Sequence, residues 1–84
     1  MEEKLIGKIT HYFTNIGVAV LELSDGQLSV GDKIHIKGST SDFEQTIDSM
    51  QVEHENVEKA KKGDAIGLKV DQQVREGDEV YRVK

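Results

Sequence analysis

The stretch SVGDKIHIKG, residues 29–38, places a Gly-Asp pair directly before a run in which apolar and polar residues alternate. Such alternation is typical of a strand with one buried face, so we predict a strand over Lys33 to Lys37. The same pair recurs at Gly63-Asp64 and Gly77-Asp78, each time just before another predicted strand. Glycine permits the positive φ that tight turns need, and aspartate accepts hydrogen bonds from nearby amides. We therefore interpret the three pairs as turns that begin strands, in preference to glycine loops that cradle a ligand.

The rest of the chain also carries the pattern of short strands separated by turns. We predict six strands in all: Lys4 to Phe13, Ile16 to Leu23, Lys33 to Lys37, Asp42 to Glu53, Ala65 to Val70 and Glu79 to Val83. Most of them are rich in β-branched or aromatic residues, and glycine or small polar residues lie between them. A short extended piece containing Leu28 and Val30 precedes the third strand.

Three segments depart from regular alternation. Gly7 interrupts the first strand, which predicts a bulge or a close approach of a neighbouring backbone. In the fourth strand the apolar residues change face between Ile47 and Met50, which predicts a bulge near Asp48-Ser49. The segment His54 to Gly63 has acidic residues before basic ones at helical spacing, so we expect a tight connection with one helical turn.

The connections between the predicted strands decide the fold class. Most are too short for a parallel crossover, which needs a dozen or more residues, so antiparallel pairing is favoured. Closure of the sheet would remove the exposed edges of a small sheet. The sequence therefore predicts an all-β fold, a small six-stranded antiparallel closed β-barrel, formed by a single domain over residues 1–84.

Composition excludes several classes of function. The chain contains no cysteine, which rules out disulfides, thiolate metal sites and cysteine nucleophiles. Its formal net charge is −5, which opposes general binding to phosphate backbones, so we expect no DNA partner. No segment approaches the roughly 18–20 apolar residues of a membrane helix, and the amino terminus lacks the pattern of a secretory signal. We expect a cytoplasmic protein with no membrane partner.

The order of the sequence blocks resembles a known family. GKIT, GVAVLEL, LSVGDKIHIKG, IDSMQVEHENVEKAKKGDAIGLKV and REGDEVYRV follow one another as in domain 2 of the translational GTPases, typified by elongation factor Tu. The resemblance rests on Leu28 to Ile36, Ile47 to Val52, Ala60 to Leu68, and Val74 to Val80. It spans nearly the whole chain and implies the six-stranded β-barrel of translation proteins.

The resemblance also implies a function, limited by what is missing. No G-x-x-x-x-G-K-[ST] phosphate loop occurs, and Lys62-Gly63 is followed by an acidic residue. The chain therefore resembles the barrel without its GTPase domain, a non-enzymatic module that docks to a protein or RNA partner in translation or RNA metabolism. Similar barrels also end some collagenase-like peptidases linked to RNA modification. The alternative is therefore an accessory domain of such an enzyme, supplied as a separate chain.

Apolar residues on the first two strands suggest a docking surface. Tyr12 and Phe13 are neighbours on one strand and so point to opposite faces. Val18 and Val20 share one face of the next strand, which is apolar on both faces. Because a barrel buries only one face, the other is left for a partner. We predict binding through Tyr12, Val18 and Val20.

A basic patch near residue 60 is the second candidate binding feature. Lys59, Lys61 and Lys62 form the only dense cluster of basic residues. We predict that they assist docking electrostatically, by contact with RNA phosphates or an acidic partner. Taken by itself, the charge pattern favours the alternative, a solvated turn balanced by Glu55 and Glu58.

The sequence gives little support to catalysis or metal binding. His11, His35 and His54 lie in separate segments and match no zinc-ligand spacing, so we predict no metal site and no cofactor. A small metal-dependent or ligand-storing barrel is a third alternative, which requires the histidines to converge in the fold. No Gly-x-Ser-x-Gly motif occurs, and the 16 acidic residues single out no catalytic pair. We expect a binding protein that is not an enzyme.

Overall fold

The computed structural model describes residues 3–39 and 42–83, and every regular element in them is a β-strand. The strands are β1 Glu3–Phe13, β2 Val18–Leu23, β3 Gln27–Ser29, β4 Lys33–Lys37, β5 Asp42–Thr46, β6 Met50–Val52, β7 Glu55–Val57, β8 Lys59–Lys61, β9 Ala65–Lys69 and β10 Glu79–Val83. In this part of the chain no helix is long and apolar enough to cross a membrane. The all-β prediction is confirmed.

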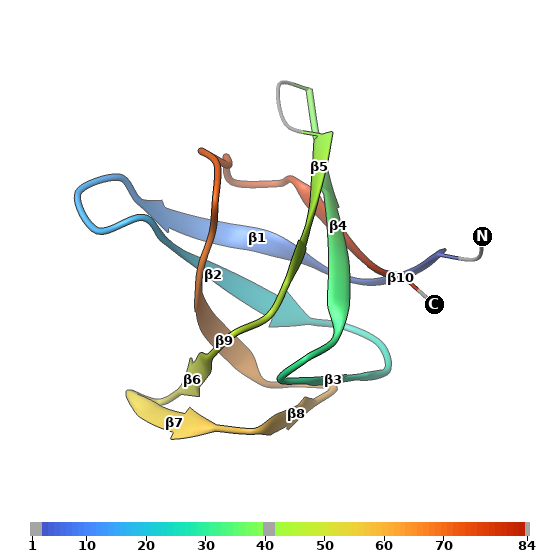
Figure 1. Cartoon of the computed structure of the whole chain (residues 1–84). Helices are drawn as coiled ribbons and strands as arrows, with labels where there is room; N and C mark the ends of the chain where they lie inside the picture. Colours follow the sequence, from blue (N-terminus) through green and yellow to red (C-terminus); the bar gives the residue numbers. More distant parts are fainter. Residues whose placement is uncertain (1–2, 40–41, 84) are drawn as a thin grey trace.

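Eight strands form one antiparallel sheet in the order β5-β4-β10-β1-β2-β9-β6-β7, and β3 pairs with β8 in a second sheet. Figure 1 shows the larger sheet strongly curved, with β3 and β8 together at the bottom of the view. The expected six-stranded closed barrel is not confirmed. The described residues form ten strands, and backbone pairing leaves β5 and β7 as the two ends of the larger sheet.

β1 is the longest strand and is paired on both sides. Its first part pairs with β10 and its second part with β2, and its register shifts between Leu5 and Gly7 and again between Ile9 and His11. Such bulges bend a strand and increase its twist. A Cβ atom on Gly7 would lie 2.1 Å from the carbonyl oxygen of Glu22. The expected bulge and the expected close backbone approach at Gly7 are therefore both confirmed.

Each Gly-Asp pair closes a four-residue turn in the same way. The aspartate amide donates to the carbonyl of the turn's first residue at 3.0–3.1 Å, and the aspartate Oδ2 accepts from that residue's amide at 2.8–3.0 Å. The glycines have φ values of 91–96°. The three turns begin at Ser29, Lys61 and Arg75. The interpretation as turns is confirmed.

Beyond the turn, each glycine and aspartate together face a single residue of the adjacent backbone, which lies in a strand in two cases and directly after β5 in the third. The glycine amide donates to that residue's carbonyl, and that residue's amide donates to the aspartate carbonyl, at 2.7–3.0 Å. The facing residues are Ile47 for Gly31-Asp32, Leu23 for Gly63-Asp64 and Ile9 for Gly77-Asp78. Two residues opposite one, with a positive-φ glycine first, define a G1 β-bulge. β4, β9 and β10 are therefore each preceded by a G1 β-bulge of the same kind, which explains the repeated Gly-Asp pair.

The inward faces of the strands supply one aliphatic core. Leu21, Leu28, Ile34, Ile66 and Val80 are completely inaccessible to solvent, and they come from both sheets. Burial of each such side chain contributes about 1.5–3 kcal/mol. The core therefore holds the two-stranded sheet against the larger one and fixes the positions of the outward-facing residues.

The predicted fourth strand is interrupted, as the change of face suggested. β5 ends before Ile47 and β6 begins at Met50, and both of these side chains are buried. Gln45, within β5, links this strand to the segment that follows β9. Its Nε2 donates to the carbonyl of Lys69 and its Oε1 accepts from the amide of Asp71, both at 2.9 Å. The Gln45 side chain thus donates one hydrogen bond and accepts another, as the backbone of a residue in a paired strand would.

The expected helical turn in residues 54–63 is wrong. That segment forms β7 and β8, which pair with β6 and β3. Val52 lies opposite Glu55, so Glu53 and His54 form a two-residue hairpin, with φ values of 53° and 65°. Positive φ at both positions is the geometry of a type I′ turn. Helical ion pairs contribute only about 0.2–0.5 kcal/mol each, and the strand pairing outweighs them here.

Candidate functional site

An apolar depression lies on the outer face of the sheet, over β2, β9 and β6, with a volume of about 390 Å³. We call it the outer hollow. Phe13 and Ile16 are 44% and 63% exposed, which is unusual for large apolar side chains that lie together. The outer hollow is lined by Phe13, Ile16, Val18, Val20, Gln51, Glu53, His54, Ala65 and Gly67.

Strand register explains why the surface is hollow here. Val20 of β2, Gly67 of β9 and Gln51 of β6 lie opposite one another across three strands. Gly67 has no side chain to fill the middle of this row. A Cβ atom placed on it would touch only Val18 Cγ1, at 3.9 Å. The next outward residue on β9 is Ala65, which is also small, so the depression continues along the strand.

The structure divides the apolar residues that the sequence grouped. Val18 and Val20 lie in the outer hollow, but Tyr12 lies opposite the buried Ala19 and packs against the core. Phe13 lies opposite Val18 instead. The prediction that Tyr12 shares an outer face with the two valines is therefore wrong, because the register shift after Ile9 reverses the faces of the residues that follow.

The predicted basic patch lies elsewhere. Lys59 and Lys61 are the exposed ends of β8, on the two-stranded sheet, and Lys62 is in the second Gly-Asp turn. None of the three lines the outer hollow. Within residues 3–39 and 42–83, none of them forms an ion pair, so the expected balance with Glu55 and Glu58 is absent there. The role of these lysines, with RNA or an acidic protein, stays a prediction.

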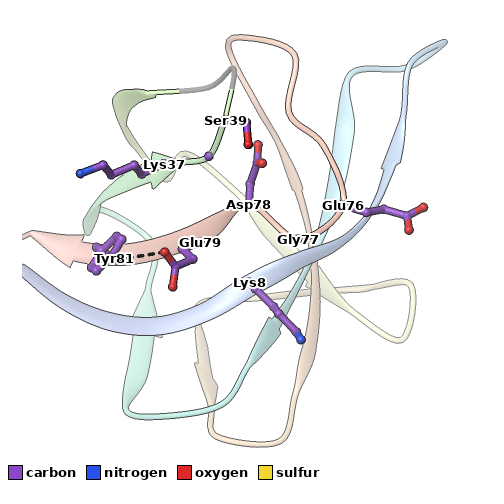
Figure 2. Close-up of a pocket in the computed structure, with 9 residues that line it drawn as sticks. Lys8, Lys37, Ser39, Glu76, Gly77, Asp78, Glu79 and Tyr81 are labelled. Carbon is purple, nitrogen blue, oxygen red and sulfur yellow. Dashed lines mark hydrogen bonds between the residues drawn. The ribbon is translucent and has the colours of Figure 1, made fainter.

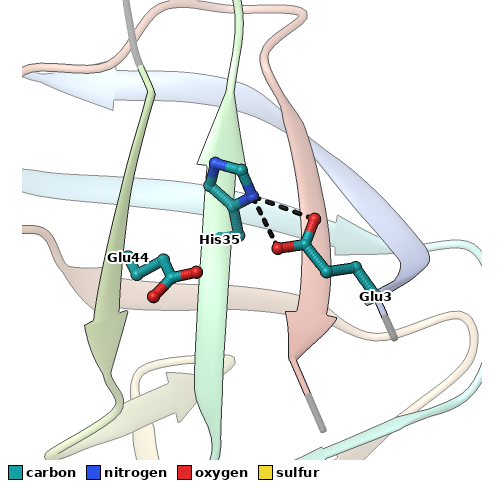
Figure 3. A group of neighbouring side chains, drawn as sticks. All are labelled: Glu3, His35 and Glu44. Atoms are coloured by element: carbon teal, nitrogen blue, oxygen red, sulfur yellow. Dashed lines mark hydrogen bonds and ion pairs between the residues drawn. The ribbon is translucent and has the colours of Figure 1, made fainter. Parts of the chain in front are cut away.

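A histidine cluster is the second candidate site, and it joins three strands. His35 of β4 lies with its Nδ1 2.9 and 3.0 Å from the carboxylate oxygens of Glu3 on β1 (Figure 3). Its Nε2 is hydrogen-bonded to Asp42 of β5. Glu44, also on β5, lies beside them and pairs with Lys33 at 3.1 Å. The bonds to Asp42 and then to Glu3 raise the pKa of His35, and the bond to His35 lowers the pKa of Asp42.

The other two histidines lie apart from this cluster. The His11 ring packs against the Phe13 ring with 4.4 Å between centroids, and its Nδ1 lies 3.7 Å from Glu76. His54 belongs to the β6–β7 turn on the rim of the outer hollow. The three histidines thus do not converge, and the alternative of one site built from all three is wrong.

A larger depression, of about 570 Å³, surrounds the third Gly-Asp turn. Figure 2 shows that Lys8 and Lys37, on its two sides, point in different directions. The Tyr81 hydroxyl donates to Glu79 at 3.3 Å, and burial followed by the charge of Glu79 raises the pKa of this tyrosine. The polar groups do not meet at one point, so this depression lacks the convergent set that a small-molecule site has.

The polar groups of the fold are already satisfied. In the described part of the chain, every buried side-chain nitrogen or oxygen has a hydrogen-bond partner. The hydroxyl groups of Thr10 and Ser24 donate to backbone carbonyls rather than to a histidine. These hydrogen bonds stabilise the fold and leave no buried polar side-chain atom in the described residues free to bind a ligand. The outer hollow is therefore the stronger candidate for a binding surface.

Comparison with known proteins relates the chain to peptidases. No protein-family profile matches it. An uncharacterized protease of Methanocaldococcus jannaschii is 42% identical over 80 residues, which are 94% of this chain and 19% of that protein. A collagenase of Porphyromonas gingivalis is 38% identical over 82 residues, which are 96% of this chain and 23% of the collagenase. The chain therefore spans about a fifth of the length of these relatives.

Solved structures show the same fold. The crystal structure of the C-terminal domain of a Geobacillus thermoleovorans protein described as a U32 peptidase matches with a TM-score of 0.88. It is 17% identical, and the match covers 96% of this chain and 93% of that domain. Its selenomethionine variant gives a TM-score of 0.84 at 18% identity, with 95% and 99% covered.

These findings correct the resemblance to domain 2 of elongation factor Tu and the expected role in translation. The relatives that match nearly the whole chain are a protease and collagenases, and two of the matching structures are of the C-terminal domain of a U32 peptidase. The quoted blocks contain the three Gly-Asp bulges and the core strands. Such positions report how strands begin and pack, and they do not identify a ligand.

Proposed function

We propose that this chain is a non-catalytic accessory domain of a collagenase-like peptidase. The observation that supports this proposal is the pattern of coverage. Relatives named protease and collagenase match 92–96% of this chain but devote only 19–23% of their own length to it. The matching solved domains stand at the C-terminal end of a U32 peptidase. A small module beside a larger body is the arrangement expected of an accessory domain.

The outer hollow is the proposed contact with that larger body. Its occupant is the remaining polypeptide of the peptidase, which in the relatives makes up about four-fifths of the chain. Phe13 at the end of β1 and Ile16 in the β1–β2 connection offer an apolar edge. Val20 and the small residues of β9 leave room for an inserted side chain. Apolar anchors that fill pockets contribute most of the energy at protein interfaces.

The proposed contact requires a stiff platform, and we infer that the curved sheet closes into a barrel through Gln45. Its side chain bonds to Lys69 and Asp71 at 2.9 Å, across the gap between β5 and the end of β9. Gln45 is only 7% exposed, so these bonds are shielded from water. Closure without a continuous backbone ladder would keep β9, the floor of the outer hollow, fixed relative to β5.

The test uses the Porphyromonas gingivalis collagenase, whose matching segment is removed or replaced by this chain. Collagen cleavage should fall at least tenfold on removal and return in the chimera, while this chain alone should cleave no collagen. Full activity of the truncated collagenase would refute an accessory role for the segment. Collagen cleavage by the 84-residue chain alone would refute the non-catalytic assignment.

Two matched substitutions in the chimera test the surface. Gly67→Phe fills the outer hollow and should abolish the recovery, whereas Gly67→Ala leaves most of it open and should retain the recovery. Thermal melting of the two isolated variants is the control, and both should unfold cooperatively. Equal activity of the two chimeras would leave the accessory role standing but move the contact away from the outer hollow.

A further inference from the structure

The histidine cluster combines an imidazole and carboxylates at a spacing that could hold a metal ion. One ligand atom from each of Glu3, His35 and Glu44 lies within 4.8 Å of the other two. The three side chains come from β1, β4 and β5, so the fold brings them together from distant parts of the sequence (Figure 3). We propose that these three residues bind one divalent transition-metal ion, with Zn²⁺ as the expected occupant.

The donor set indicates the class of ion. One imidazole nitrogen with two carboxylates is a set that Zn²⁺ accepts, with metal–ligand distances of about 2.0–2.2 Å. Donor atoms around a tetrahedral ion of that size lie about 3.3 Å apart. His35 Nδ1 and Glu3 lie at 2.9 Å, so the Glu3 carboxylate would move off the axis of the ring nitrogen's lone pair to admit the ion, and the Glu44 carboxylate would move inward. An all-oxygen ion such as Ca²⁺ would not use the imidazole.

Asp42 adds a feature that an ordinary acidic patch lacks. It is hydrogen-bonded to Nε2, the ring nitrogen of His35 that faces away from Glu3. Histidines that bind metals almost always have their second ring nitrogen held by a carboxylate or carbonyl, which fixes the ring and strengthens its donor nitrogen. Asp42 would act as this positioning residue and leave Nδ1 for the ion.

Charge also favours a divalent ion at this place. A divalent ion brings positive charge next to the carboxylates of Glu3 and Glu44. In a chain whose net charge is −5 this relieves repulsion among carboxylates. Lys33, which pairs with Glu44 at 3.1 Å, would turn outward to solvent.

Titration calorimetry of the untagged 84-residue chain with ZnCl₂ tests the proposal. One ion per chain is expected. Glu44→Gln is the most informative variant because Glu44 makes no hydrogen bond to His35, so the rest of the cluster stays intact. It should weaken Zn²⁺ binding about 10- to 100-fold, and Asp42→Asn should weaken it by a similar factor through loss of ring positioning.

His54→Gln is the matched control, since His54 is also exposed but lies on the β6–β7 turn; its Zn²⁺ affinity should equal that of the unmodified chain. A nitrogen-15 spectrum of the imidazoles should show that the ring signals of His35 shift on binding, whereas those of His11 and His54 do not. The proposal is overturned if no Zn²⁺ binds at millimolar concentration, if Glu44→Gln binds as tightly as the unmodified chain, or if His54→Gln abolishes binding.

Discussion

Replacement of Gly63 by alanine isolates the energetic contribution of a Gly-Asp bulge. Gly63 has a φ of 96°, and no atom lies within 4 Å of the position that a Cβ would occupy. The substitution therefore creates no clash, and its effect is backbone strain alone. For an L-residue in the left-handed region this strain is about 1–2 kcal/mol. In a domain of this size each kcal/mol lowers the melting temperature by about 4–8 °C, so we expect a decrease of about 4–16 °C.

Thermal and urea unfolding followed by circular dichroism would measure the change. Gly63→Asn is the companion variant and should lose less stability, because asparagine occupies the left-handed region several times more readily. Gly31→Ala and Gly77→Ala should match Gly63→Ala, since their φ values are 96° and 91° and their surroundings are equally open. The reasoning fails if alanine is tolerated without loss at all three positions, or if asparagine destabilises more than alanine.

Three further perturbations test other parts of the structure. Gly7→Ala should lower the free energy of unfolding in urea by about 3 kcal/mol, because its Cβ would lie 2.1 Å from the Glu22 carbonyl oxygen. Gly67→Ala, whose Cβ would lie 3.9 Å from its nearest neighbour, should be neutral or slightly stabilising. Equal effects of the two substitutions would contradict the close approach at Gly7. Leu21→Ala should lose about 2–5 kcal/mol, since this side chain is fully buried, and a loss below 1 kcal/mol would mean that the core collapses around the cavity. The carboxylate partners raise the pKa of His35, so its contribution is fully present below its ordinary value of 6.5 and is lost as pH rises through the folded-state value. The difference in unfolding free energy between the wild type and His35→Gln should therefore shrink toward alkaline pH, and a constant or growing difference would be inconsistent with this linkage.

Local chemistry made the strand starts predictable. A Gly-Asp pair forms its turn from local interactions alone, because glycine adopts the positive φ and the aspartate side chain accepts a hydrogen bond from the amide three residues earlier. The three turns could therefore be predicted without knowledge of the rest of the fold. The change of face between Ile47 and Met50 marked the position of an irregularity, but it predicted a bulge within one strand, whereas the structure ends β5 at Thr46 and begins β6 at Met50.

Faces and pairings that depend on distant partners were not predictable in this way. Counted from the buried Ile9, simple alternation would place Tyr12 outward, but the shift between Ile9 and His11 turns it inward. That shift is set by pairing with β2. Residues 54–63 became strands for a similar reason, through partners on β6 and β3.

The outer hollow was missed for a related reason. Gly67 within an apolar strand was a usable signal of a close approach or a gap. Its position between Val20 and Gln51, however, follows only from the register of three strands. The histidine cluster likewise forms only because the fold brings β1, β4 and β5 close together, and no local sequence motif predicts this.

The pairing of Glu3 with Val83 determines how the fold would respond to mechanical tension. β1 and β10 are antiparallel and meet at the same end, so a force that separates these two residues loads one hydrogen-bonded pair at a time. Such peeling is expected to begin at low force and to advance as far as the bulge at Ile6, where β1 becomes secured by β2 as well. A pull applied between the β1–β2 connection and β10 would instead load many bonds together. The same domain would thus be compliant in one direction and resistant in another.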